Sequence, residues 1–99
     1  MSSPSEPNYR VSRLPHVLQQ IKDLVNAATS DDERQQRINV LASVYKRLED
    51  DPSDFGDPEY RTKKTGGKIY HAILRPFIVK YALYELEKAV VILQVKLVL

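Results

Sequence analysis

The sequence of 99 residues contains no cysteine and only three glycines. Without cysteine, disulfide bonds and thiolate chemistry are excluded, and nothing implies an oxidising compartment. A long apolar run is also missing, because the most apolar stretch, residues 89–99, is too short to cross a bilayer and is interrupted by Gln94 and Lys96. Residues 1–9 lack the basic start and the apolar segment of a secretory signal. We therefore expect a cytoplasmic protein with no membrane partner.

The length suits one small domain with a single hydrophobic core. Residues 1–8 are rich in serine and proline and carry no periodic apolar residue, so we expect a disordered tail there. Residues 9–99 are expected to form the domain.

Charge is distributed unevenly along the chain, although the net charge is only +2. Residues 1–59 carry 7 Lys and Arg against 11 Asp and Glu, whereas residues 60–99 carry 8 against 2. A basic half of this kind indicates an anionic partner, either nucleic acid or an acidic protein segment. The alternative is an ordinary solvated face.

Helical periodicity dominates the first half of the domain, after a short strand expected around residues 9–13. Pro15 begins a helix, since its missing N–H costs nothing at that position. Ser30 begins a second helix and forms a capping box with Glu33; the helix ends before Pro52. The short break between the helices predicts an antiparallel hairpin. The apolar positions expected in the core are Leu14, Val17, Leu18, Ile21, Leu24, Val25, Ala28, Ile38, Leu41, Tyr45 and Leu48.

Three strands are expected in the second half, at residues 68–74, 77–84 and 89–98. They follow residues 50–67, which are expected to be an irregular linker. The polar connection 85–88 predicts an antiparallel hairpin of the last two strands. The sequence thus predicts an α+β fold of order β-α-α-β-β-β, an antiparallel sheet with a two-helix hairpin packed on one face.

Strand parity assigns the two faces of the predicted sheet. The face expected to pack on the helices carries Phe77, Val79, Tyr81 and Leu83 of one strand, and Ala89, Val91, Leu93, Val95 and Leu97 of the next. The opposite face, with Lys80, Gln94 and Lys96, is expected to be open or only partly covered.

This element order, together with "FIVKYALYELEKAVVILQVKLV", resembles the RelE/ParE superfamily of bacterial toxins over residues 9–98. An aromatic residue before an apolar-x-Tyr matches Phe77 to Tyr81, an acidic hairpin matches residues 85–88, and a β-branched strand matches Val90 to Val95. The resemblance implies a toxin-like component of a toxin–antitoxin system. It also implies a partner antitoxin that binds through an acidic or apolar segment.

Members of this superfamily act on two kinds of target, which the resemblance offers as alternatives. RelE-type members cleave mRNA on the ribosome, and ParE-type members inhibit DNA gyrase. Ile78 stands where RelE-type members often place a catalytic arginine, and the family's further basic residues and tyrosine would follow Leu99. We therefore expect a degenerate nuclease site and a protein that acts by binding an anionic partner or antitoxin.

Residues for the alternative, a ribosome-dependent mRNA endoribonuclease, are nevertheless present. His71 can act as base or acid near neutral pH, and Arg75 and Lys80 can hold phosphate. The residues expected to bind RNA, another anion or antitoxin are Arg61, Lys63, Lys64, Lys68, Tyr70, Tyr84 and Lys96. A structural or simply exposed role for His71 competes with catalysis, because Ile69 and Ile73 share its face and suggest core.

Other kinds of site receive no support. His16 and His71 are too few and too far apart for a metal site, and Gly66-Gly67 lacks the pattern of a phosphate-binding loop, so we expect no metal and no cofactor. A third interpretation remains, a non-toxic interaction domain that has kept the scaffold. It would pair or form a homodimer through the strand 89–98 at a sheet edge.

Overall fold

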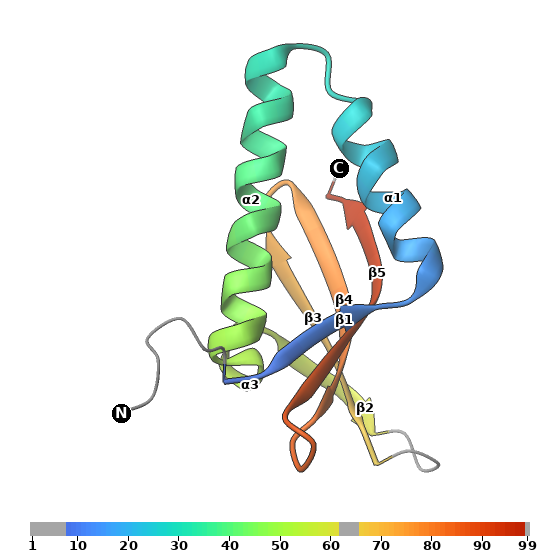
Figure 1. Ribbon diagram of the computed structural model, residues 1–99, viewed down its shortest axis with the longest axis vertical. Helices are drawn as coiled ribbons and strands as arrows, with labels where there is room; N and C mark the ends of the chain where they lie inside the picture. The colour runs from blue at the N-terminus through green and yellow to red at the C-terminus, as the bar shows by residue number, and fades with distance from the viewer. Residues whose placement is uncertain (1–7, 62–65, 99) are drawn as a thin grey trace.

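The computed structural model describes residues 8–61 and 66–98, which form a five-stranded sheet with helices on one face (Figure 1). Lys63 and Lys64 and most of the expected tail lie outside the described residues. In chain order the elements are β1 (Arg10–Arg13), α1 (Pro15–Asn26), α2 (Asp31–Asp50), α3 (Pro52–Phe55), β2 (Asp57–Arg61), β3 (Lys68–Leu74), β4 (Phe77–Tyr84) and β5 (Ala89–Leu97).

The strand order is β1-β5-β4-β3-β2, and the predicted α+β class and order of elements are confirmed. The sheet is mixed rather than wholly antiparallel, because β1 pairs parallel to β5. The expectation of an irregular linker over residues 50–67 was wrong, since α3 and β2 lie within it. No helix in the described ranges is long and apolar enough to cross a membrane.

The helices α1 and α2 form the predicted hairpin (Figure 1). Ser30 caps α2 as expected, its Oγ accepting a hydrogen bond from the Glu33 N–H at 3.1 Å. The second half of the expected capping box is missing: the Glu33 carboxylate instead accepts from the Thr29 hydroxyl at 2.9 Å and from the Arg37 guanidinium at 2.7 Å. Glu33 thereby ties α2 to the preceding loop rather than to its own N-cap.

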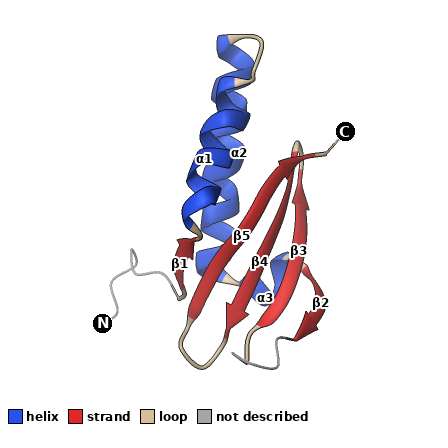
Figure 2. Cartoon of the chain, turned by 90° about the vertical axis from the view of Figure 1, so that its right-hand side faces the viewer, coloured by secondary structure: helices blue, strands red, loops and turns tan. Residues whose placement is uncertain are grey.

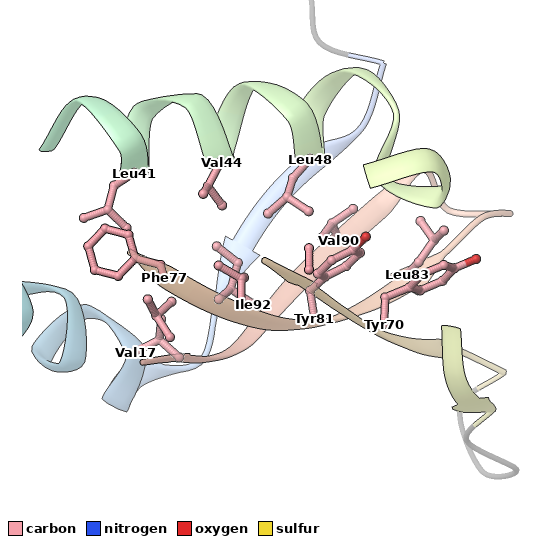
Figure 3. Close-up of a cluster of buried hydrophobic side chains, with 13 residues drawn as sticks. Val17, Leu41, Val44, Leu48, Tyr70, Phe77, Tyr81, Leu83, Val90 and Ile92 are labelled. Atoms are coloured by element: carbon pink, nitrogen blue, oxygen red, sulfur yellow. The ribbon is translucent and has the colours of Figure 1, made fainter. Parts of the chain in front are cut away.

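The core lies between the helix hairpin and the sheet, where α2 points a row of side chains at β4 and β5 (Figure 3). The predicted inner face of β4 is confirmed, since all four of its residues are at most 1% exposed. The main core residues are Val17, Leu41, Val44, Leu48, Phe77, Val79, Tyr81, Leu83, Val90 and Ile92.

Three positions expected in the core are substantially exposed: Leu14 by 37%, Leu18 by 40% and Ile38 by 43%. The hairpin extends beyond the end of the sheet (Figure 2), so its outer turns have no strand beneath them. In α1 only Val17 is buried, because this helix lies beside β5 at the flank of the sheet. The apolar stripe predicted for α1 is thus only partly covered.

A β-bulge in β5 overturns half of the predicted inner face of that strand. Lys80 pairs with Gln94 and Tyr81 with Ile92, which leaves Leu93 as an extra residue. An inserted residue shifts the alternation by one. Val90 and Ile92 therefore face the core before the bulge, where Ala89, Val91 and Leu93 were expected. Beyond it the parity is as predicted, with Val95 3% exposed and Gln94 and Lys96 on the opposite, open side.

The third interpretation, an interaction domain, requires the last strand at a sheet edge, but the first half of β5 pairs with β1 over Ala89 to Ile92. The second half continues past the end of β1 beside α1. There His16 Nε2 lies 3.1 Å from the Leu93 carbonyl oxygen, and the Val95 N–H donates to Gln20 Oε1 at 3.0 Å. Side chains of α1 thus satisfy the part of the edge that β1 leaves unpaired.

Candidate active site on the open face

The open face is the face of β3, β4 and β5 that is turned away from α1 and α2 (Figure 2). The register places His71 opposite Lys80, and Lys80 opposite Gln94, across three neighbouring strands. Because directly opposed residues share a face, these three polar side chains form a row. His71 was expected to share its face with two core residues, Ile69 and Ile73. Ile69 is buried as expected, but Ile73 is 55% exposed, so the expectation was wrong for Ile73.

A fourth polar residue, Glu59, joins this row from β2. The pairing of β2 with β3 shifts register between Pro58 and Tyr60, so Glu59 is an extra residue. Its Oε1 lies 3.0 Å from His71 Nδ1 and its Oε2 lies 3.8 Å from Lys80 Nζ. The Lys80 ammonium also lies 5.6 Å from the centre of the Tyr60 ring. We call Glu59, Tyr60, His71 and Lys80 the open-face cluster.

Three members of the open-face cluster are half-buried, with side-chain exposures of 32% for Glu59, 39% for His71 and 35% for Lys80. The fourth, Tyr60, is 54% exposed. The Nδ1 atom of His71 is itself buried, and despite its closeness to Glu59 it forms no well-directed hydrogen bond with a described residue. Ion pairs at this exposure contribute at most about 1 kcal/mol to stability. The cluster therefore adds little to folding but brings together a carboxylate, an imidazole and an ammonium group.

This combination can perform acid–base chemistry on a phosphate ester, because each of its three ionisable groups can take a different part in the reaction. A carboxylate can accept a proton, an imidazolium can donate one, and a neighbouring ammonium can stabilise negative charge on phosphate oxygens. The same carboxylate offsets the positive charge of the row, so the open face is less basic than the composition of residues 60–99 suggests.

Glu59 was missed by the reasoning from sequence, in which it belonged to the irregular linker expected over residues 50–67. The signal that could have located it is weak: Pro58 is tolerated in an edge strand, and Tyr60 favours a strand. In β2 the register shift falls after only two paired residues, and two more follow it. The strand therefore has no regular alternation of apolar and polar residues that could be recognised in the sequence.

Arg75 does not join the cluster with His71 and Lys80. It lies in the turn between β3 and β4, where it lines a cavity with residues of α2. The three residues expected to form one catalytic group are therefore divided between two places.

The residues expected to bind an anion are likewise dispersed. Tyr70 is 4% exposed and its ring is stacked on Tyr81 at 5.4 Å, so it lies in the core and is not an open stacking surface. Lys68 Nζ lies 3.9 Å from a Glu85 carboxylate oxygen. Lys96 is exposed on the open face, and Tyr84 is half-buried. Arg61 is the last residue of β2 and pairs with Lys68.

In the described part of the chain, no three histidine, aspartate or glutamate side chains gather closely enough to hold a metal ion.

Two solved toxin–antitoxin structures are similar to this chain. One is the archaeal RelE–RelB complex from Pyrococcus horikoshii OT3, with a TM-score of 0.65 and 19% identity, covering 91% of this chain and 94% of that one. The other is the toxin–antitoxin complex RelBE2 from Mycobacterium tuberculosis, with a TM-score of 0.68 and 18% identity, covering 93% and 99%. No family model matches the sequence, and no curated protein matches it significantly. The chain therefore has the fold of the RelE/ParE toxins that its sequence resembles.

Proposed function

We propose that the protein is the toxin-like component of a toxin–antitoxin pair and acts by binding. The observation that carries this proposal is the likeness over more than nine-tenths of the chain to proteins solved within toxin–antitoxin complexes. Its partner is an antitoxin-type polypeptide. The likeness also spans nearly the whole length of those chains. This favours a shared mode of action over a likeness limited to one structural motif.

The open face is the surface we assign to an acidic or amphipathic partner segment. Lys96 and Gln94 are exposed there, and Ile73 and Ile78 provide an apolar surface beside them. Lys80 is already close to Glu59, so Lys96 is the cation that an approaching carboxylate meets first. A mixed surface of this kind suits a segment with alternating acidic and apolar residues.

The test is co-expression of this chain with the products of its neighbouring genes, followed by calorimetry of the pair that co-purifies. Lys96→Glu is expected to weaken the complex at least tenfold. Lys22→Glu is the matched control, because Lys22 is exposed on α1 and the change in charge is identical. The proposal fails if overexpression of the chain alone does not slow growth and no neighbouring gene product co-purifies with it.

A second candidate function, mRNA endoribonuclease, is favoured by one observation, the position of Glu59 between His71 and Lys80. In such a reaction the ionised Glu59 takes the proton of the ribose 2′-OH, and the 2′ oxygen attacks the adjacent phosphorus. The bond from phosphorus to the 5′ oxygen breaks, and protonated His71 gives its proton to that oxygen. Lys80 stabilises the negative charge of the transition state.

Incubation with translating ribosomes and a defined mRNA tests this second candidate. Glu59→Gln and His71→Ala should each lower the cleavage rate by two orders of magnitude or more, as is usual for loss of a general acid or base, roughly 10²–10⁴-fold. Lys22→Ala should leave the rate unchanged. Cleavage that persists in both active-site variants would contradict this assignment.

A further inference from the structure

A cavity of about 340 Å³ lies between α2 and the turn that joins β3 to β4. Figure 1 shows this turn at the end of the sheet next to α2, and the lining residues of α2 come from its first turns. Its lining residues are Glu33, Gln36 and Arg37 of α2, and Arg75 and Pro76 of the turn. The cavity is therefore separate from the open-face cluster, and its volume is at the lower end of the range for small-ligand sites, roughly 300–1,000 Å³.

One wall of the cavity is an ion pair with its charges already balanced. Arg37 Nη2 donates to Glu33 Oε1 at 2.7 Å, and Arg37 Nη1 donates to the carbonyl oxygen of Leu24 at the end of α1. The other oxygen of Glu33 accepts from the Thr29 hydroxyl. With its side chain only 12% exposed, Arg37 is held in place from both helices. The Glu33–Arg37 pair therefore has a net charge of zero.

Three polar groups of the cavity have no partner among the described residues. Arg37 Nε is buried and has no hydrogen-bond partner among the described residues. Arg75 is exposed and forms no hydrogen bond or ion pair with any described residue, and the same is true of the Gln36 amide. The cavity thus presents one uncompensated positive charge and one neutral amide donor.

We propose that this cavity binds a carboxylate, with Arg75 as the charged contact and Gln36 as a second donor. The planar guanidinium of arginine matches a carboxylate with two parallel hydrogen bonds. A single uncompensated charge favours a monoanionic group over a phosphate dianion, which would also lie close to Glu33. The carboxylate can come from an acidic side chain of a partner polypeptide or from a free small molecule. The site goes beyond the proposed function, since it uses none of the open face.

The experiment follows the arginine Nε–H resonances by NMR during two titrations at constant ionic strength. The probes are succinate and a tetraglutamate peptide blocked at both ends. Chloride, added as the sodium salt, is the reference anion. The Arg75 Nε–H resonance is expected to shift and saturate, and the buried Arg37 Nε–H should shift with it. In Arg75→Gln the response of Arg37 should be lost, whereas Arg10→Gln, which removes the same charge from β1, should retain it.

The two titrations distinguish the sources of the carboxylate. Saturation by the peptide at a concentration at least tenfold below that of succinate identifies an acidic polypeptide side chain as the ligand. Similar saturation by both probes shows that a free small carboxylate is sufficient, and either result supports the site. Shifts that never saturate, that chloride reproduces, or that persist in Arg75→Gln would overturn the proposal.

Discussion

Gln20 Oε1 accepts a hydrogen bond from the backbone N–H of Val95 at 3.0 Å, across 75 positions of sequence. Val95 lies in the part of β5 that continues beyond the end of β1, where none of the described strands pairs with its outer edge. One helical turn earlier, His16 Nε2 lies 3.1 Å from the Leu93 carbonyl oxygen, an acceptor on the same strand. Unpaired edges recruit other strands. The helix α1 therefore protects an edge that would otherwise be open to pairing.

Gln20→Ala should expose this edge. We expect a loss of about 1 kcal/mol in the free energy of unfolding, because a partly buried backbone donor loses its acceptor. The Val95 amide should exchange faster in the variant than in the wild type. The Lys96 amide, whose neighbours are unchanged, should exchange at the same rate in both. Gln19→Ala is the matched control, since Gln19 bonds only to the exposed Asp23. Equal exchange rates of the Val95 amide in wild type and Gln20→Ala would show that the side chain does not cap this donor.

Glu59→Gln should strengthen binding of polyanions to the open face. The substitution removes the negative charge beside His71 and Lys80 while keeping a side chain of the same size. We expect a two- to threefold rise in affinity for poly(U) at low salt, and a smaller rise at higher salt because of screening. Fluorescence anisotropy at two salt concentrations measures both.

The control for this substitution is Glu87→Gln, which changes net charge equally in the exposed hairpin between β4 and β5. A similar gain in both variants would mean that overall charge, rather than the position of Glu59, governs the affinity.

The sequence predicted the sheet most accurately where a strand is regular. The inner face of β4 followed from simple alternation, because Phe77 to Leu83 runs without interruption through the centre of the sheet. Alternation failed in β5 because the extra residue, Leu93, is apolar like the four residues before it, 89–92. An apolar residue can occupy either face, so no feature of the sequence marks the bulge.

The candidate site was predicted only in part, for a related reason. His71 and Lys80 were both selected as candidates from the sequence, but their pairing across two regular strands is a result of the structure. Glu59 lies at a bulge in a short edge strand with a proline beside it, so its position depends on pairing with β3 rather than on local pattern. Arg75 follows the end of β3, where strand parity no longer determines direction, and the structure places it beside α2.

Gly56→Ala should destabilise the fold, because the backbone at Gly56 lies against the backbone of His71 and the hydroxyl of Tyr81. A Cβ atom at this position would lie 2.6 Å from Tyr81 Oη and 2.7 Å from the His71 carbonyl oxygen. We expect a loss of about 2 kcal/mol, typical of overpacking at a tight contact. Urea denaturation with a constant m-value measures the change.

Gly66→Ala provides the comparison for this glycine. Gly66 has φ of +74° but no atom within 4 Å of a Cβ there, so only backbone strain of about 1 kcal/mol is expected. A cost at Gly56 no greater than that at Gly66 would contradict the close approach of Gly56 to Tyr81.

Tyr81→Phe should lower stability at neutral pH and weaken its dependence on alkaline pH. The buried Tyr81 hydroxyl donates to the Pro52 carbonyl, so its removal should cost about 1–2 kcal/mol. Burial, with the neighbouring Tyr70, raises the pKa of Tyr81 above its ordinary value of 10.0. Its contribution is therefore complete below pH 10. Above pH 10 the unfolded chain loses this proton while the native chain keeps it, and stability should fall by up to about 1.4 kcal/mol per pH unit.

Urea denaturation at pH 7 and at several values above pH 10 tests both effects. The wild type should lose stability more steeply than Tyr81→Phe over the alkaline range, because the variant lacks this proton in both states. Tyr60→Phe makes the same chemical change at a position that is 54% exposed, and it should alter neither the neutral stability nor the slope. If Tyr81→Phe kept the full alkaline slope of the wild type, the proton held in the folded state would belong to another group.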